Sequence, residues 1–420
     1  MRLSMFKNRV FQINIVLVLI LISCGNKTNH ETVKNDLILE EVQNNSTTVT
    51  QTEIIVGANR INTYLPLLEG KHIGLVANQT SVIFNSDNEL HTHLVDSLIA
   101  LKVDVKKVFA PEHGFRGTAD AGELVKDGTD TKTGIPIVSL YGKNKKPSLE
   151  QLTGLDIVIF DIQDVGARFY TYISTLHYVM EACAEAGITV IVLDRPNPNG
   201  HYVDGPTLKM EYRSFVGMHP IPVVHGMTIG EYAKMINGEG WLKNKVTCDL
   251  KVIEMKHYTH DKTYSLPIKP SPNLPNDQAI NLYPSLCFFE GTNVNAGRGT
   301  SKQFQIYGSP YLDKDVYTFK YLPSPNQGAK FPKHEGKLCY GEDLSEREQL
   351  NTLDLSYLIN GYHNSIDKKL FFNDFFIKLA GTELLQKQIE NGLSEADIKA
   401  SWQDELSAFK TMRRLYLIYE

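Results

Sequence analysis

From residue 54 onward, short apolar runs of strand length alternate along the chain with longer segments of helical spacing. The run at 158–160 is entirely apolar, and only Thr189 interrupts the run at 188–193, which is typical of strands buried on both faces. Further runs lie at 72–77, 103–110 and 136–140. Apolar residues at helical spacing follow at 90–101 and from about Tyr170 to Glu185. This alternation predicts right-handed βαβ crossovers and a parallel sheet covered by helices, an α/β Rossmann-like architecture.

The pattern changes after about residue 305. The chain is rich in Tyr, Pro and Lys to about 340, and segments rich in Glu, Lys and Leu follow. The stretch 402–419 has a helical apolar face. We therefore expect a Rossmann-like domain over 54–300 and a second, smaller α+β domain over 301–420 that packs against the edge of the sheet.

The first 24 residues have the pattern of a secretory signal. Arg2, Lys7 and Arg9 form a basic start, and a short apolar core at 13–22 follows, which is too short to span a bilayer. The core ends in Leu-Ile-Ser-Cys at 21–24, which resembles a bacterial lipobox and predicts cleavage before Cys24 and acylation of its sulfur. The alternative is an uncleaved anchor with an incidental cysteine. We expect an exported protein that is lipid-anchored to a bacterial membrane and faces the periplasm.

Composition narrows the possible partners. Residues 25–53 are mostly polar and have no period, so we expect a flexible tether there. The formal net charge is −5, with no basic run, which argues against nucleic acid as a partner.

The other four cysteines lack CxxC spacing and are expected to be buried small hydrophobes, with no cysteine metal site: Cys183, Cys248, Cys287 and Cys339. The chain contains no dinucleotide fingerprint, no phosphate loop and no Gly-x-Ser-x-Gly elbow, so we expect no cofactor and no ordinary serine hydrolase.

Polar side chains crowd the exits of the predicted strands. The carboxyl ends of parallel strands share one edge of a sheet, where ligands bind in open α/β folds, so these residues should converge. The exits carry Asn78 and Gln79; Glu112, His113 and Arg116; Asp161, Gln163, Asp164, Arg168 and Tyr170; and Asp194, Arg195 and Asn197. A plain strand-to-helix turn with caps and an Asp–Arg surface pair is the alternative for the exit at 161–172.

Paired carboxylates are the chemistry that these exits suggest. A carboxyl group beside apolar or aromatic walls can serve as a general acid, and Glu112 lies in a rigid Pro- and Gly-flanked loop. Asp161 or Asp164 is the candidate second carboxylate, a pair of the kind that glycoside hydrolysis requires. Structural alternatives remain open: Glu112 as a fixed loop acceptor, Asp164 paired with Arg168, and Tyr170 as part of a first helical turn instead of a sugar-stacking wall.

Loops further along the chain add candidates for substrate binding. His225 precedes a capping box formed by Thr228 and Glu231, and Asn273 is presented by a proline-fixed loop. Glu290 and Arg298 suit a charged, hydroxylated ligand, because an arginine can hold a carboxylate bidentately. An ordinary surface ion pair is the alternative for these two.

The chain resembles the exo-β-N-acetylmuramidases of glycoside hydrolase family 171, long described as a domain of unknown function. The resemblance covers roughly 54–420 and runs through 74–81, 110–117, 161–172, 193–198, 290–293 and 297–300. It implies a Rossmann-like domain with a smaller C-terminal domain, and release of N-acetylmuramic acid from non-reducing ends of peptidoglycan fragments. It also implies that the glutamate of the Pro-Glu-His-Gly motif, here Glu112, is the acid/base.

We expect muropeptide or MurNAc–GlcNAc fragments as substrates. Arg168 or Arg298 would then read the lactyl carboxylate that distinguishes muramic acid from glucosamine. Two alternatives belong to other classes. One is a tethered glycan-binding protein without turnover, and the other is a metal-dependent hydrolase that uses His113, Asp161, Asp194 and His225.

Overall fold

The computed structural model describes residues 53–84, 90–116 and 127–420. By internal contacts the chain divides into two units, Met1–Gln51 and Thr52–Glu420, and all described residues belong to the second. The predicted signal at 1–24, with Cys24, and nearly all of the predicted tether at 25–53 therefore lie outside the described residues.

A seven-stranded sheet forms the centre of the N-terminal part, in the order β5-β6-β4-β1-β7-β8-β9. All neighbouring pairs are parallel except β5 with β6. The strands are β1 (His72–Ala77), β4 (Asp104–Ala110), β5 (Gly128–Thr129), β6 (Pro136–Ser139), β7 (Ile157–Asp161), β8 (Thr189–Leu193) and β9 (Leu250–Ile253). The predicted α/β sheet is thus confirmed, and the strand order reverses between β1 and β7, where open sheets bind ligands.

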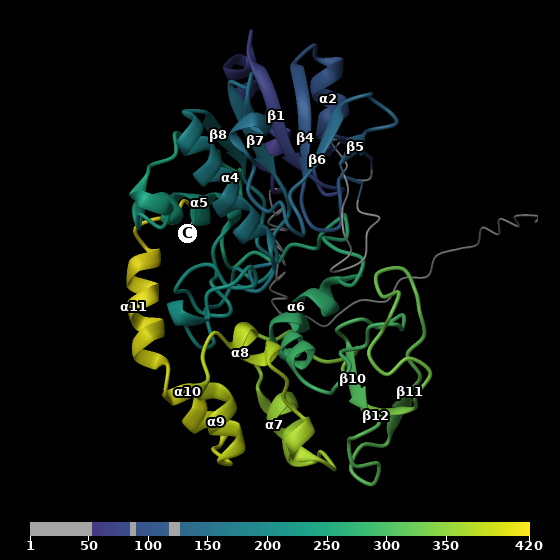
Figure 1. The fold of residues 1–420 in the computed structure, drawn as a ribbon. Helices are drawn as coiled ribbons and strands as arrows, with labels where there is room; N and C mark the ends of the chain where they lie inside the picture. Colours follow the sequence, from purple (N-terminus) through teal and green to yellow (C-terminus); the bar gives the residue numbers. More distant parts are fainter. Residues whose placement is uncertain (1–52, 85–89, 117–126) are drawn as a thin grey trace, which may run out of the picture. The chain divides into compact units, whose positions relative to one another are not determined.

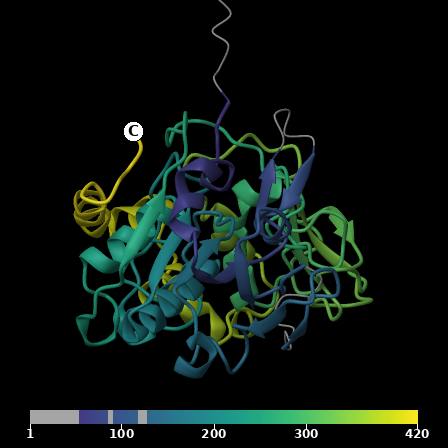
Figure 2. The ribbon, with the colours of Figure 1, turned by 90° about the horizontal axis from the view of Figure 1, so that it is seen from above.

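Both faces of this sheet are buried, as the apolar runs predicted. Val158 and Phe160 of β7 belong to the core cluster that includes α4 (Tyr172–Ala186) and α5 (Ile229–Gly238), while Ile157 and Ile159 belong to the cluster with α2 (Leu94–Ala100). Residues that alternate along a strand point to opposite faces, so β7 contributes to both cores. Figure 1 shows the helices around the sheet, and Figure 2 gives the view from above.

The helix predicted over 90–101 is shorter in the structure. Residues His91–His93 form β3, which pairs with β2 (Val82–Phe84) in a small antiparallel ladder. Helix α2 begins only at Leu94, because the His93 ring accepts a hydrogen bond from the backbone N–H of Val95 and caps the helix there. Helical periodicity alone did not reveal this start.

The C-terminal part combines an antiparallel sheet with helices, which confirms the smaller α+β domain. Its strands, in the order β10-β12-β11, are β10 (Ile306–Ser309), β11 (Phe319–Tyr321) and β12 (Cys339–Asp343). Its helices are α6 (Asp277–Leu286), α7 (Ser356–His363), α8 (Phe375–Ala380), α9 (Leu384–Glu390), α10 (Glu395–Ala400) and α11 (Gln403–Arg413). Their apolar residues join the core cluster of α4 and α5. In Figure 1, α11 leads the chain back toward α5.

Short helices complete the described chain: α1 (Ile61–Tyr64), α3 (Leu149–Leu152), and the 3-10 turns η1 (Gly57–Asn59), η2 (Leu65–Leu68), η3 (Met210–Tyr212), η4 (Lys243–Lys245), η5 (Cys287–Gly291) and η6 (Lys368–Leu370). Cys183, Cys248, Cys287 and Cys339 are free thiols in the interior, as predicted. Within the described ranges, no helix has the length and apolar character needed to cross a membrane.

Candidate active site

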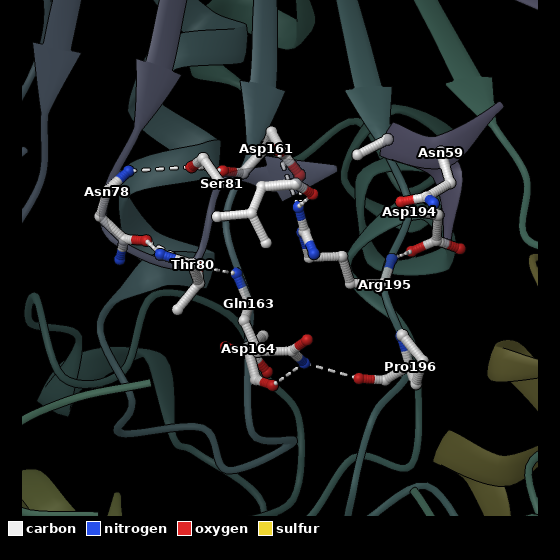
Figure 3. Close-up of polar contacts among 12 residues, drawn as sticks. Asn59, Asn78, Thr80, Ser81, Asp161, Gln163, Asp164, Asp194, Arg195 and Pro196 are labelled. Carbon is white, nitrogen blue, oxygen red and sulfur yellow. Dashed lines mark hydrogen bonds and ion pairs between the residues drawn. The ribbon is translucent and has the colours of Figure 1, made fainter. Parts of the chain in front are cut away.

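The polar side chains at the strand exits do converge, but many of them bind one another. Asp161 at the end of β7 is fully buried, and its carboxylate receives a bidentate ion pair from Arg195, with Nε at 2.6 Å and Nη2 at 2.9 Å. Asn78 caps its own turn by accepting from Thr80, and Gln163 donates to the Pro196 carbonyl at 2.6 Å (Figure 3). This network fixes the loops that follow the central strands.

Asp194 and Asn197 belong to the same framework. The Asp194 carboxylate accepts hydrogen bonds from the Thr228 hydroxyl, the Gly230 N–H and the Tyr419 hydroxyl, at 2.7 to 2.8 Å. Asn197 donates to the Met227 carbonyl at 2.9 Å. Since Asp161, Asp194, Arg195 and Asn197 are buried and satisfied by protein groups, we assign them structural roles instead of the catalytic or binding roles that their positions predicted.

Arg168 is also a structural residue. Its guanidinium is fully buried and donates to four backbone carbonyls at 2.7 to 2.8 Å, those of Pro206, Ile221, Leu379 and Ala380. Burial lowers the pKa of Arg168 to about 9. Because the last two carbonyls lie in α8, this side chain joins the C-terminal part to the loop after β7. Arg168 therefore does not present its charge to a ligand, in contrast to the sequence prediction.

Asp164 and His225 form a separate buried pair. The His225 Nε2 lies 3.7 Å from Asp164 Oδ2, which also accepts a 2.7 Å hydrogen bond from the Gly166 N–H. Burial raises the pKa of Asp164 to about 7 and lowers the pKa of His225 to about 3. Neither residue lines the cavity that contains Glu112, so the structure does not place Asp164 beside Glu112 as a second carboxylate.

A cavity of about 320 Å³ collects most of the remaining candidates. Its lining combines two carboxyl side chains and one arginine with aromatic rings, as expected for a site that orients a polar ligand. The predicted residues in the lining are Glu112, His113, Tyr170, Asn273, Glu290 and Arg298. The other lining residues are Tyr141, Phe169, Thr171, Tyr172, Phe215, Val216, Ser271, Leu274, Tyr283, Cys287, Phe304, Phe375 and Leu379.

Glu112 enters this cavity from the turn that follows β4. The turn is closed by the Gly114 N–H, which donates to the Pro111 carbonyl at 3.0 Å, and His113 adopts the left-handed region with φ of 69°. A non-glycine residue in that region costs on the order of 1 kcal/mol, strain of a kind that clusters at functional sites. Glu112 Oε2 accepts a 2.7 Å hydrogen bond from the Thr171 hydroxyl. Burial, together with the charge of Glu112 and a hydrogen bond to it, raises the pKa of Tyr141.

Aromatic rings build the wall beside Glu112. The Tyr170 ring packs edge-on against Tyr172 at 4.9 Å and against Tyr283 at 5.8 Å, and Tyr283 packs against Phe304 at 4.9 Å between ring centroids. The Tyr170 hydroxyl donates to the Pro270 carbonyl at 2.9 Å. Tyr170 lies before the first residue of α4, so it forms part of the cavity wall and not of the helical turn.

Glu290 and Arg298 stand together in the same lining. Arg298 Nε donates to Glu290 Oε1 at 2.8 Å, and its guanidinium lies 5.2 Å from the centre of the Phe304 ring. Burial alone would raise the pKa of the Glu290 carboxyl, but the charges of Arg298 and Lys333 hold this pKa below its ordinary value. Among the described residues of the lining, Arg298 is the only lysine or arginine. The pair therefore offers one oriented cation to the cavity.

Three other predicted residues lie outside this lining. Gln79 donates through Nε2 to the carbonyls of Lys269 and Pro270, at 3.2 and 3.1 Å. Arg116 pairs with Asp130 at 2.8 Å and stacks over the Phe115 ring at 4.4 Å. Asn78 contacts the site through Tyr172, whose hydroxyl accepts from Asn78 Nδ2 at 2.9 Å. Asn78 thus supports a wall residue of the site, Gln79 lines a neighbouring cavity, and Arg116 lines a further one.

Sequence reasoning did not single out Thr171 as a site residue, although the crowded exit at 161–172 contains it. Tyr141 directly follows a strand and could be found by the same exit rule. Tyr283, Phe304 and Phe375 come from segments distant in sequence and carry no local signal.

Comparisons with known proteins identify the same family in the N-terminal and the C-terminal part of the chain. Residues 73–278 match the family described as "Exo-beta-N-acetylmuramidase NamZ, N-terminal", and 281–419 match its C-terminal counterpart. A curated relative, the peptidoglycan beta-N-acetylmuramidase NamZ of Bacillus subtilis (strain 168), is 41% identical over 386 residues, which cover 86% of this chain and 90% of the relative.

Two crystal structures of DUF1343 family proteins from Bacteroides fragilis NCTC 9343 share the fold. One is 46% identical, with a TM-score of 0.80, covering 88% of this chain and 99% of that chain. The other is 26% identical, with a TM-score of 0.72, covering 87% and 99%.

Proposed function

The chain belongs to the exo-β-N-acetylmuramidase NamZ family, and on this premise we propose that it hydrolyses terminal non-reducing N-acetylmuramic acid from peptidoglycan fragments. One observation carries the assignment of the site: Glu112, held by Thr171, and Arg298, held by Glu290, line the same aromatic cavity. A proton donor and a carboxylate reader are the two groups that this substrate requires.

Glu112 is the proposed general acid. It gives its proton to the oxygen that leaves the anomeric carbon, so that the bond can break without release of an alkoxide. Water supplies the hydroxyl group of the released sugar, and its remaining proton returns to solvent, from which Glu112 is protonated again. The hydrogen bond from Thr171 orients Glu112 Oε2 throughout.

Arg298 is the proposed reader of the lactyl carboxylate. Its Nε donates to Glu290, and among the described residues this is the one hydrogen bond that the Arg298 side chain makes. The remaining guanidinium nitrogens can donate to a carboxylate, and a charge-assisted contact of this kind is stronger than a neutral one. Glu290 is the second carboxylate of the lining. Because it accepts a hydrogen bond from Arg298, we assign it the role of orienting this arginine.

A direct assay tests this function. Purified protein is incubated with a chromogenic β-N-acetylmuramide and with the matching β-N-acetylglucosaminide, and aglycone release is followed for both. We expect hydrolysis of the muramide and little of the glucosaminide. Binding of muramide-bearing fragments without release of sugar would support the glycan-binding alternative instead.

The metal-dependent alternative finds little support in the geometry. Its four residues are separated: His113 lines the cavity, Asp161 pairs with Arg195, Asp194 binds Thr228, and His225 pairs with Asp164. Across the described residues, no group of three or more His, Cys, Asp or Glu side chains is arranged to hold a metal ion. Loss of activity in EDTA that added metal restores would nevertheless favour this alternative.

We also propose that Cys24 is the lipid-bearing N-terminus of an exported protein and that residues 25–53 tether the enzyme to the membrane. The support is the sequence alone, namely the basic start, the short apolar core and the lipobox-like ending. An enzyme that acts on cell-wall fragments needs access to the compartment in which they occur.

A further inference from the structure

A second cavity, of about 840 Å³, lies beside the one that contains Glu112; we call it the outer cavity. It is lined by Gln79, His91, Pro267, Ile268, Lys269, Ser271, Pro272, Pro275, Thr300, Ser301, Gln303, Asn326 and Gln327. Its volume is within the range of sites that bind ligands larger than one sugar ring. The mechanism described above uses none of these residues.

The two cavities share their dividing wall. Ser271 lines both, and its neighbours separate them: Asn273 faces the inner cavity, while Pro272 faces the outer one. The segment at 298–304 also separates the two cavities. Arg298 and Phe304 line the inner cavity, and Gln303 lines the outer one. A ligand that passes over Ser271 therefore reaches both cavities.

The dividing wall stands next to the proposed acid. The Tyr172 hydroxyl lies 3.5 Å from the Glu112 carbonyl and 3.4 Å from the Pro270 carbonyl. The Pro270 carbonyl also accepts from Gln79, a residue of the outer cavity. A general acid must touch the leaving oxygen, so the leaving group lies on the Glu112 side of the cleaved bond. A leaving group that extends from Glu112 over the shared wall at Ser271 enters the outer cavity.

The lining of the outer cavity suits a neutral, hydroxylated ligand. Its described residues include no carboxylate, and apart from Lys269 and His91 the polar groups are hydroxyls and carboxamides. Proline rings supply apolar surface between them. Gln79 Oε1 and Asn326 Oδ1 are buried, and neither makes a hydrogen bond to any described residue. A buried polar group without a partner is costly, and a ligand hydroxyl or amide would satisfy it.

From this arrangement we propose that the outer cavity binds the saccharide on the leaving side of the cleaved bond, and that it extends over more than one sugar. The proposal rests on the function proposed above and adds to it. The enzyme would release the terminal sugar from the inner cavity and prefer oligosaccharides over a sugar with a small aglycone. Stem peptides, which carry carboxylates and amines, are the less favoured occupants of this neutral lining.

The test compares kcat/KM for three substrates: nitrophenyl N-acetylmuramide, the MurNAc–GlcNAc disaccharide and the corresponding tetrasaccharide. Ser301→Trp places a large ring in the outer cavity from an exposed position that does not line the inner one. Gln303→Leu removes a carboxamide of the lining at similar volume. We expect each variant to lower the ratio of tetrasaccharide to nitrophenyl kcat/KM by about tenfold, as loss of one or two hydrogen bonds does.

Ser407→Trp is the matched control, because Ser407 is exposed on α11 and lines neither cavity. It should leave the ratio of the wild type unchanged. If the wild type cleaves the nitrophenyl muramide but Ser301→Trp and Gln303→Leu keep the wild-type ratio, the inference is wrong and the proposed function stands. If the ratio responds to a stem peptide on the leaving side but not to sugar number, the saccharide assignment is wrong. A wild type that cleaves no muramide contradicts the proposed function itself.

Discussion

The Thr171 hydroxyl donates a 2.7 Å hydrogen bond to Glu112 Oε2, although 59 positions separate the two residues. Thr171 is the N-cap residue of α4, yet its side chain caps no backbone N–H of that helix. An N-cap hydroxyl normally stabilises its helix by about 1 kcal/mol. Here the hydroxyl instead fixes the carboxyl at the exit of β4 from the start of a helix that is packed on the sheet.

Thr171 is therefore predicted to position the acid. Thr171→Val keeps the shape but removes the donor, and we expect kcat on the MurNAc–GlcNAc disaccharide to fall about tenfold with little change in KM. Thr171→Ser, which restores the hydroxyl, should recover most of the rate. A rise in KM at unchanged kcat would show that Thr171 contacts the substrate instead of orienting Glu112.

Glu112→Gln tests the acid itself. The amide keeps the shape but cannot transfer a proton, so the variant should fold normally and lose roughly 10²–10⁴-fold in rate on the disaccharide. The loss should be much smaller on a nitrophenyl muramide, because a nitrophenolate leaves without protonation. An equal loss on both substrates would exclude Glu112 as the acid, and full activity on both would make it a loop residue.

Arg298→Met should alter specificity. Loss of a charge-assisted contact to the lactyl carboxylate is expected to cost on the order of 2–4 kcal/mol in kcat/KM for the muramide, with little effect on the glucosaminide. Arg168→Met is the contrasting variant. Its four carbonyl partners would lose their donors in the interior, so the free energy of unfolding should fall by about 3 kcal/mol or more. A specificity change in Arg168→Met with unchanged stability would reverse these assignments.

Asp164 gives a prediction for pH dependence. Burial raises its pKa to about 7 in the folded protein, so the folded state binds its proton more tightly than the unfolded state does. This stabilisation is complete below the ordinary pKa of an aspartate and is lost as pH rises through 7. Asp164→Asn should therefore be more stable than the wild type at pH 8, by on the order of 1–4 kcal/mol, and nearly equal at pH 4. Denaturant unfolding at both pH values measures the difference, and a gap that does not grow with pH would contradict the prediction.

Cys24→Ala tests the anchor outside the described residues. If the lipobox assignment is correct, the variant is no longer acylated and its precursor is not processed at this site. Metabolic labelling with a fatty acid should mark the wild type and not the variant. Labelling that survives the substitution would show that the lipid is attached elsewhere or that another cysteine carries it.

The sequence by itself determined the sheet and much of the chemistry. The buried run of β7 and the alternating pattern predicted the parallel sheet, because a strand covered on both faces must be apolar throughout. The Pro-Glu-His-Gly turn indicated Glu112, and the loop residues Glu290 and Arg298 were identified as a possible ion pair, which the structure shows at 2.8 Å. These signals are local, so the amino-acid order alone carries them.

Only the tertiary structure decided which polar groups face a ligand and which face each other. From the sequence alone, Asp161 was a candidate catalytic carboxylate and Arg298 a candidate for substrate binding. Arg195, which lies 34 positions away, neutralises Asp161 in the interior, while Arg298 lines the cavity. The Arg168 guanidinium likewise donates hydrogen bonds to carbonyls of α8, a helix that lies more than 200 positions later in the sequence. Burial of a charge is tolerated only with partners, and those partners come from distant segments that fold together. The spacing of residues along the chain does not encode that choice.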